Sequence, residues 1–199
     1  MQNSPSGSCV GLLLAAGRGR RFDPAGEHDK LRQLLPDGRT VAATAAANLL
    51  RGVAHVVAVV RLDAPQMAQE LAGLGCEILA CENADDGMAA SLVMGLAHTA
   101  NAGGWVIALA DMPWVLPATI RVLITAIDQG ADIAVPICRG LRGNPVAFGP
   151  AHLPHLLQLE GDQGARSLLK KFAVTEVMVD DPGVHRDIDT PTDMQRLVS

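Results

Sequence analysis

The loop that follows an apolar run near the N-terminus could bind an anion. The run ends at Leu14, Ala15 and Ala16, and Lys30 lies a little downstream of the loop, whose residues are Gly17, Arg18, Gly19, Arg20 and Arg21. Glycines let backbone N–H groups approach a ligand closely, while guanidinium and ammonium groups supply charge that suits a triphosphate. From spacing alone, a surface loop with solvated arginines is an equally good interpretation.

The glycines match neither of two common phosphate-binding motifs. Gly17-Arg18-Gly19 begins as G-x-G-x-x-G does, but Phe22 occupies the third glycine position. The sequence contains no G-x-x-x-x-G-K-[ST]. What remains is a cationic turn after a strand. Lys30, downstream of that turn, could neutralise the α-phosphate oxygens of a nucleotide while its pyrophosphate is displaced.

Three aspartates could hold a metal ion. Asp111 ends the apolar run at 106–110, and Asp187 and Asp189 lie on the same side of an extended segment. Magnesium prefers few carboxylates together with waters and substrate phosphates, so one to three aspartates suffice. The alternative is that Asp111 caps a turn or helix and that Asp189 caps the terminal helix.

Further polar loops could contact the substrates. Gly87 would let the backbone approach a base or ribose, and Ser91 lies one turn inside the helix that follows. Helix capping by Asp85 or Asp86 is the simpler explanation of that stretch. Two glycine-marked turns in the second half could contact an acceptor or be turns only, and their candidate residues are Asn144, Pro145, Asp162 and Arg166.

Short apolar strands alternate with helices along the chain. Strands are expected at 9–15, 54–60, 77–80, 105–110, 132–136, 145–148 and 174–179. Helices are expected at 39–52, 64–74, 87–99, 117–129, 153–158, 164–172 and 191–198. This alternation predicts one α/β domain over 9–199, after a flexible N-terminus at 1–8, with a mostly parallel central sheet and helices on both faces. Ligands of such folds bind beyond the carboxyl ends of the strands, where the glycine loop and Asp111 both lie.

Composition excludes several classes of protein. The net charge is −5 and Tyr is absent, which argues against binding of nucleic acid. No apolar run approaches the ~20 residues that span a bilayer. The four cysteines form no C-x-x-C pair. We therefore expect their side chains to act as small buried apolar groups in a protein of the reducing cytoplasm. His152 and His155 lack a neighbouring acidic or Cys partner, and we expect them to face solvent.

Taken together, these stretches resemble the MobA-like NTP transferases, and within them the molybdenum cofactor cytidylyltransferases. The likeness follows the family's order and is carried by 13–22 with Lys30 and Leu31, 87–92, 109–113, 143–146, 161–166 and 187–191. It implies a Rossmann-like nucleotidyltransferase fold of the nucleotide-diphospho-sugar transferase type. It also implies that an acceptor phosphate attacks the α-phosphorus of a nucleoside triphosphate and that pyrophosphate leaves.

The resemblance also implies roles for the candidate residues. Residues 14–20 with Gly87 and Ser91 would bind the nucleotide, and Lys30 and Arg20 would act on its phosphates. Asp111 would hold Mg²⁺, with Asp189 or Asp187 as the second carboxylate. Positioning and charge neutralisation drive such a reaction, so no covalent nucleophile is required.

Ala16 bears on the base. The guanylyl-transferring branch of the family tends to have glycine there, and an alanine methyl narrows the space beside the base, which favours CTP over a purine nucleotide. The expected acceptor is molybdopterin carrying molybdenum, with a molybdoenzyme as a possible client. Guanylyl transfer, cytidylyl transfer to a sugar- or polyol-phosphate, and a non-catalytic cofactor carrier remain as alternatives.

Overall fold

An eight-stranded sheet forms the centre of the part of the chain that this computed structural model describes, residues 7–25, 28–162 and 164–195. Its order is β3-β2-β1-β4-β7-β5-β6, and β8 pairs with β5. The strands are β1 (Cys9–Ala15), β2 (Val56–Arg61), β3 (Glu77–Cys81), β4 (Gly104–Leu109), β5 (Ile133–Cys138), β6 (Leu141–Arg142), β7 (Val146–Phe148) and β8 (Thr175–Met178). The first four pair in parallel, and β7 is antiparallel to both β4 and β5.

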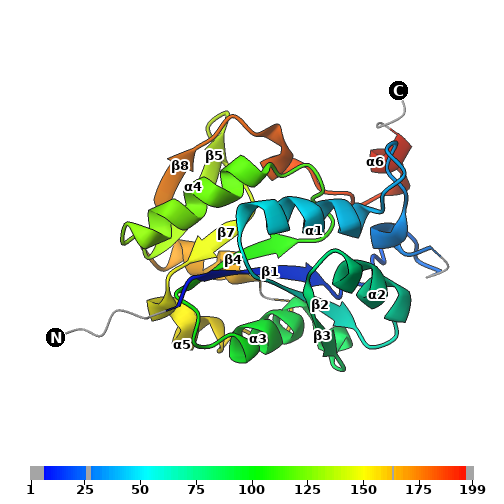
Figure 1. The fold of residues 1–199 in the computed structure, drawn as a ribbon, viewed down its shortest axis with the longest axis horizontal. Coiled ribbons are helices and arrows are strands. Elements are labelled where there is room, and N and C mark those ends of the chain that lie inside the picture. The colour runs from blue at the N-terminus through cyan, green and yellow to red at the C-terminus, as the bar shows by residue number, and fades with distance from the viewer. Residues whose placement is uncertain (1–6, 26–27, 163, 196–199) are drawn as a thin grey trace.

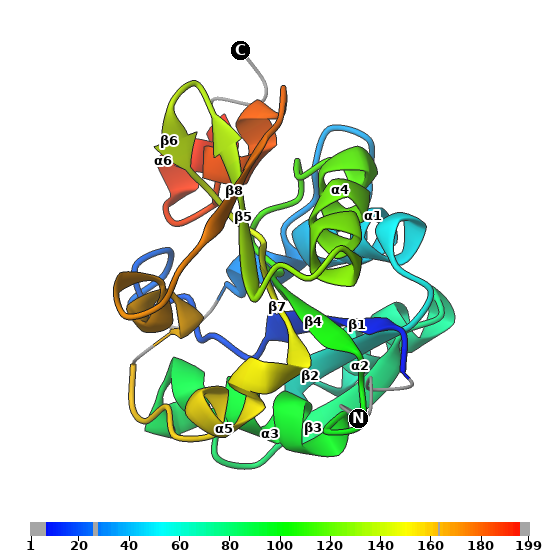
Figure 2. The ribbon, with the colours of Figure 1, turned by 90° about the vertical axis from the view of Figure 1, so that its left-hand side faces the viewer.

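Helices cover both faces of this sheet (Figures 1 and 2). One face carries α1 (Val41–Gly52), α2 (Pro65–Gly73) and α4 (Pro117–Asp128). The other carries α3 (Met88–His98) and α5 (Leu153–Leu156). A short α6 (Pro191–Gln195) follows near the C-terminus. The predicted α/β fold with a mostly parallel sheet is therefore confirmed.

Strand β1 lies inside the sheet, between β2 and β4, and both of its faces are buried. Cys9, Leu13 and Ala15 pack into the core beneath α1 and α4, whereas Val10 and Leu12 pack into the core against α3. Alternate side chains of a strand point to opposite faces, so one apolar run supplies both cores. The carboxyl end of β1 lies beside that of β4, with Leu14 paired to Leu109.

Most of the predicted elements form close to their expected bounds. The first strand matches at both ends, and the first helix starts at Val41 because the Thr40 hydroxyl accepts from Ala43 N at 3.0 Å and caps it. The helix expected at 164–172 is a 3-10 helix, Ala165–Lys170. Residues 1–6 of the expected flexible N-terminus, and 196–198 of the terminal helix, lie outside the described residues.

The cysteines behave as expected, and one histidine does not. All four cysteines are free and buried. His155 is exposed, but the expectation that His152 faces solvent is wrong, because its ring packs edge-on against Phe148 and Phe172 and is 5% exposed. Burial lowers the pKa of His152 below its usual value, which keeps the ring neutral at neutral pH.

No helix in the described ranges has the length and apolar character that a bilayer span requires.

A buried aspartate from a distant segment caps α4. The residue before the helix, Leu116, has no side-chain acceptor of its own. Instead, Asp181 accepts from Leu116 N at 2.8 Å and from the Thr119 hydroxyl at 2.6 Å, and its other oxygen accepts from Gly183 N at 2.9 Å. Asp181 is 2% exposed. It fixes the segment that leads to Asp187 and Asp189 against the body of the domain.

We expect Asp181→Ala to lower the free energy of unfolding by about 2 kcal/mol or more, because three donors lose their acceptor and two of these hydrogen bonds are buried. Urea unfolding monitored by circular dichroism measures this loss. Asp180→Ala is the matched control, since Asp180 is the exposed neighbour and no described contact depends on it. Equal stability of the two variants would contradict the capping role.

Candidate active site

The loop after β1 is a tight turn that is anchored in the core. Gly19 has a φ of +60°, which favours glycine, and its carbonyl accepts from Phe22 N at 2.8 Å and from Asp23 N at 3.1 Å. The Phe22 side chain is buried and holds the turn in place. A Cβ on Gly19 would lie 3.1 Å from Cγ of Lys30, so the backbone packs on the lysine stem.

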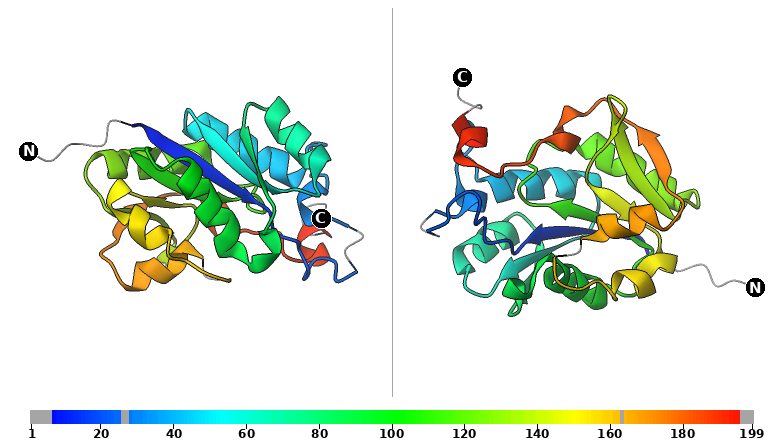
Figure 3. Two further views of the ribbon diagram at one scale, coloured as in Figure 1. Left: turned by 90° about the horizontal axis from the view of Figure 1, so that it is seen from below. Right: turned by 180° about the vertical axis from the view of Figure 1, so that it is seen from behind.

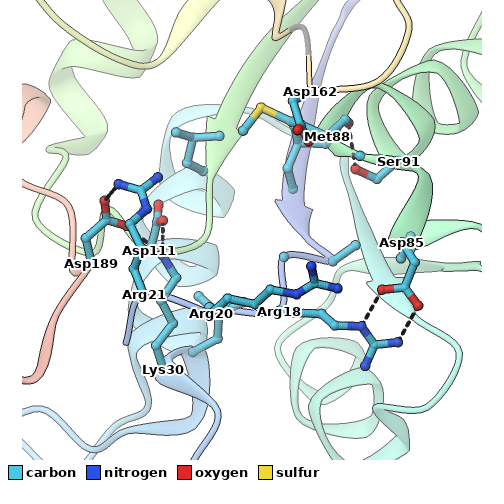
Figure 4. Close-up of a pocket in the computed structure, with 18 residues that line it drawn as sticks. Arg18, Arg20, Arg21, Lys30, Asp85, Met88, Ser91, Asp111, Asp162 and Asp189 are labelled. Atoms are coloured by element: carbon cyan, nitrogen blue, oxygen red, sulfur yellow. Dashed lines mark hydrogen bonds and ion pairs between the residues drawn. The ribbon is translucent and has the colours of Figure 1, made fainter. Parts of the chain in front are cut away.

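Lys30 lies in a short 3-10 helix, Lys30–Arg32, whose N-cap is Asp29. Its Nζ lies 2.6 Å from Asp111 Oδ2 and 3.1 Å from Asp189 Oδ1 (Figure 4). Burial by itself lowers the pKa of Lys30, but the two carboxylates outweigh it and the pKa is raised. The site therefore holds a fixed positive charge between two aspartates.

One backbone hydrogen bond brings those two aspartates together. Ile188 is fully buried, and its N–H donates to the Asp111 carbonyl at 2.9 Å. This bond holds the C-terminal segment beside the end of β4. In Figure 3, the red helix α6, which follows this segment, lies close to the blue loop that follows β1. The Asp189 carboxylate then reaches Arg21 at 2.6 Å as well as Lys30.

The capping alternatives for these aspartates are wrong. Asp193, not Asp189, accepts from the backbone N–H of Thr190 at 2.8 Å at the start of α6. Asp181, and not Asp111, caps the helix that follows Asp111, which is α4. In the same way, the proposed capping of α3 by Asp85 or Asp86 does not occur, because neither side chain accepts from its first turn. Asp111 and Asp189 instead point toward the cationic loop (Figure 4).

Three arginines of the loop are placed differently. Arg18 binds Asp85 through two nitrogens, one of them at 2.6 Å, and Asp63 at 3.2 Å. Arg21 binds Asp189. Arg20 makes no hydrogen bond or ion pair with any described residue, and its side chain extends into the space between the other two (Figure 4). It is therefore free to bind a phosphate.

Two adjoining cavities open at this edge of the sheet. The first, about 470 Å³, is lined by the loop after β1, the N-terminal end of α3 and Lys30. The second, about 580 Å³, extends toward β6, β7 and the 3-10 helix at Ala165–Lys170. Arg21 and three carboxylates, those of Asp111, Asp162 and Asp189, line both cavities and therefore lie where the cavities meet. The apolar residues that line both are Leu14, Met88 and Leu109. Of the predicted nucleotide-binding residues, those that line the first are Leu14, Ala16, Gly17, Arg18, Gly19, Arg20, Lys30, Gly87 and Ser91. Ala15 does not line it, because its side chain is fully buried in the core beneath α1.

The glycine before α3 has a structural explanation. Gly87 has a φ of +106°, and a Cβ there would lie 2.4 Å from the carbonyl of Gly161. That same carbonyl accepts from Ala89 N at 2.9 Å. Close approach at Gly87 is therefore to Gly161, and contact with a base or ribose stays a prediction. The Ser91 hydroxyl donates to Met88 O within the helix, at 3.0 Å.

Three of the four predicted acceptor residues line the second cavity: Asn144, Asp162 and Arg166. Pro145 does not; it is buried beside a small void near α1 and α4. Asp187 lines the second cavity but not the first, and its side chain is exposed. Sequence reasoning missed Arg142 and His185, which add positive or titratable groups to this second cavity. No motif marks either residue.

The carboxylates fit a divalent cation in part. Oδ1 of Asp111 is buried and has no hydrogen-bond partner in the described structure, so one hard oxygen remains available. Asp189 lies within reach of the same lysine. No group of three His, Cys, Asp or Glu side chains suited to a metal ion occurs among the residues described. Asp187 thus does not complete a three-aspartate cage, and substrate phosphates or waters would supply the other ligands.

One partly buried arginine behind the loop is also missing from the sequence prediction. Arg61 ends β2, and its side chain is 13% exposed. It donates to the Gly17 carbonyl at 3.1 Å, to Asp63 at 2.8 Å and to Asp29 at 3.3 Å. A charged residue at the end of a buried strand, on the edge that carries the site, is the signal that could have found it.

Comparison with known proteins identifies the family of this chain. Residues 11–177 match the family model described as the MobA-like NTP transferase domain. The chain is 29% identical over 197 residues to the purine catabolism protein PucB of Bacillus subtilis (strain 168), covering 92% of each. It is 37% identical over 139 residues to a molybdenum cofactor guanylyltransferase of Burkholderia ambifaria (strain MC40-6), covering 69% of this chain and 65% of that protein.

Solved structures share the fold. Rv0371c of Mycobacterium tuberculosis H37Rv superposes with a TM-score of 0.81 at 29% identity, covering 96% of this chain and 98% of that one. A second crystal structure of Rv0371c, in complex with manganese, gives a TM-score of 0.78, at 29% identity and 96% and 97% coverage. Nucleotidyltransferases at lower identity also match, which confirms the predicted fold. The chain belongs to the MobA-like NTP transferase family and has the fold of a nucleotidyltransferase.

Proposed function

We propose that this chain transfers CMP from CTP to molybdopterin carrying molybdenum, in the cytoplasm and with Mg²⁺, and releases pyrophosphate. The observation that carries the proposal is the junction of the two cavities. Asp111, Asp189 and Arg21 lie at that junction. The loop with Arg20 lies on one side of it, and the cavity lined by Arg142 and Arg166 lies on the other. A nucleotide and an anionic acceptor could meet there.

The proposed reaction needs positioning and charge neutralisation. An oxygen of the acceptor phosphate attacks the α-phosphorus, the bond from that phosphorus to the bridging oxygen breaks, and pyrophosphate leaves. The attacking oxygen is already anionic, so no general base is needed. Arg20 and Lys30 would stabilise the phosphate oxygens, and both line the first cavity.

Asp111 and Asp189 are the residues that would hold Mg²⁺. The unpartnered Oδ1 of Asp111 supports this assignment. When bound, the ion would neutralise charge that builds up on the phosphate oxygens. The crystal structure of Rv0371c in complex with manganese supports a divalent cation in the family. Lys30 and Arg21, which now pair with these aspartates, would then be available to the phosphates.

Ala16 supports the choice of CTP. It is 4% exposed and lines the first cavity, so its methyl group takes space from whatever base lies beside it. Guanylyl transfer is the second candidate, because the relatives from Burkholderia ambifaria are named guanylyltransferases. The acceptor is supported by the same names and by the cationic residues of the second cavity, Arg142 and Arg166.

We expect CTP with Mg²⁺ to raise the melting temperature more than ATP, GTP or UTP does at equal concentration. A ligand that binds only the folded state stabilises it by RT ln(1 + [L]/Kd), so the four shifts rank the four affinities. Ala16→Gly is the matched variant, and it should increase the shift with GTP relative to CTP. A wild-type shift with GTP at least as large as that with CTP would support guanylyl transfer instead.

The acceptor is tested by pyrophosphate release. CTP and Mg²⁺ are incubated with molybdopterin carrying molybdenum, or with a sugar- or polyol-phosphate, and the pyrophosphate is measured. Release with the first acceptor supports the proposed reaction. A pure carrier of the cofactor would release none with any acceptor, although it could still bind molybdopterin.

A further inference from the structure

We propose that Arg61 is a positioning residue that fixes the anion loop and Lys30 relative to each other. The proposal rests on the proposed function, since it assumes that the loop binds the phosphates of a nucleotide. Arg61 does not line the first cavity, whereas Gly17, Arg18 and Lys30 all do. It acts from behind the loop, through the groups that it holds.

The Arg61 guanidinium bonds three separate segments. Its NH1 donates to Gly17 O in the loop, its Nε to Asp63 after β2, and its NH2 to Asp29 before Lys30. Gly17 lies 44 residues from Arg61 in the chain, and Asp29 lies 32 residues from it. Because the guanidinium is planar and rigid, three bonds in one fork fix the relative positions of all three partners.

The bond to Gly17 sets the direction of a backbone donor. In a trans peptide unit, the C=O of one residue and the N–H of the next point in opposite directions. The Gly17 carbonyl points to Arg61, so the N–H of Arg18 points away from Arg61. Gly17 and Arg18 line the first cavity and Arg61 does not. Arg61 therefore fixes the orientation of this peptide unit, and the proposal is that its N–H group serves a phosphate oxygen in that cavity.

The other two bonds reach the cationic side chains. Asp29 accepts from Arg61 through Oδ2 and from Leu31 N through Oδ1 at 3.0 Å, which caps the short helix that carries Lys30. Asp63 accepts from Arg61 through Oδ1 and from Arg18 through Oδ2. The hydrogen bond from Arg61 is the main reason why the pKa of Asp63 is lowered. One partly buried residue thus supports the loop backbone, Lys30 and Arg18.

A cavity of about 290 Å³ lies against this network, lined in part by Arg18, Arg61 and Asp63. A small cation could enter it if the Arg61 side chain were shortened. This gives the proposal a rescue experiment that a purely structural role would not predict, because guanidinium would restore the hydrogen bonds without restoring the covalent side chain.

The test uses inorganic tripolyphosphate as the probe, because it contains no base and needs no acceptor. Its binding in the presence of Mg²⁺ is measured by isothermal titration calorimetry. We expect Arg61→Met to lower the affinity at least about tenfold, since three charge-assisted hydrogen bonds are lost. Arg61→Lys should recover part of the affinity. Arg61→Ala should recover affinity when guanidinium is added at millimolar concentration, and an equal concentration of methylammonium should be less effective.

Arg39→Met is the matched control. Arg39 also binds a carboxylate through Nε and NH2, at 2.9 and 2.6 Å to Asp37, but it lines neither cavity. Its replacement should leave the affinity for tripolyphosphate unchanged. Melting temperatures of all variants show whether a loss of affinity follows from unfolding.

Hydrogen exchange separates this proposal from the proposed function. Arg61→Met should speed amide exchange in peptides that contain 16–21 and 29–33, and Arg39→Met should not. Unchanged exchange, or wild-type affinity in Arg61→Met, would overturn the positioning role. If wild type fails to bind tripolyphosphate while exchange still rises in Arg61→Met, the proposed function fails and the positioning of the loop stands.

Discussion

Asp111→Asn is expected to lower the rate of pyrophosphate release at least about 10²-fold and to leave the fold intact, because it removes a preorganised charge from the point of reaction. Asp111 lies where the two cavities meet, and its Oδ1 is buried without a partner. Asparagine has nearly the same shape but no charge. It would weaken the 2.6 Å ion pair with Lys30 and offer a single oxygen to a cation.

The fold should survive this change because Asp111 holds the C-terminal segment through its backbone. Its carbonyl accepts from Ile188 N, a bond that does not depend on the side chain. The melting temperature is therefore expected to change little. Asp187→Asn is the matched control, since that carboxylate lines the second cavity only. A near-normal rate for Asp111→Asn would overturn the assignment of Asp111 as a metal ligand. If Asp187→Asn lowered the rate as much as Asp111→Asn, the two aspartates would not have the different roles assigned to them here.

Parallel strand pairing explains why much of this site could be predicted from sequence. The glycine loop follows β1 and Asp111 follows β4, and the two strands are neighbours with Leu14 opposite Leu109. Carboxyl ends of parallel strands meet at one edge, so a continuous apolar run followed by polar residues is enough to place both groups. The bounds of β1 follow from the same run.

The choice between Asp187 and Asp189 could not be predicted. Both stand in one extended segment, and two-residue periodicity places them on the same side. What distinguishes them is the docking of that segment, through Ile188 N on Asp111 and through Asp181 on α4. These contacts join residues that lie far apart in the chain, and no local pattern encodes them. The result is that Asp189 reaches Lys30 and lines both cavities, whereas Asp187 lines the second cavity only.

Arg61 and His152 show a second limit of sequence reasoning. Both are polar side chains that a composition argument assigns to the surface, yet one is 13% exposed and the other 5%. Arg61 is partly buried, and three oxygen acceptors bind its guanidinium, two of them from distant segments. His152 is buried because its neutral ring packs with aromatic neighbours. Gly17 and Asp29 in the first case and Phe172 in the second come from distant segments, so these contacts depend on tertiary structure.

Lys30→Met is expected to bind Mn²⁺ more tightly than wild type in the absence of nucleotide, and yet to lose activity. The ammonium group lies 2.6 Å from Asp111 and 3.1 Å from Asp189, where it balances their negative charge. A divalent cation must compete with it for the same oxygens. Methionine keeps an unbranched stem on which Gly19 can pack but removes the charge. We expect an affinity for Mn²⁺ at least about fivefold higher, since even a partly screened ion pair is worth about 1 kcal/mol.

The same variant should release pyrophosphate at least about 10²-fold more slowly, because a charge that would stabilise the phosphate oxygens is lost. Titration of Mn²⁺ by electron paramagnetic resonance, without nucleotide, measures the affinity independently of activity. Lys30→Arg is the control that keeps the charge, and it should bind Mn²⁺ about as weakly as wild type. Weaker binding of Mn²⁺ by Lys30→Met than by wild type would show that Lys30 supports the cation site. Stronger binding together with loss of activity would show that Lys30 competes with the cation before the nucleotide arrives and serves the phosphates afterwards.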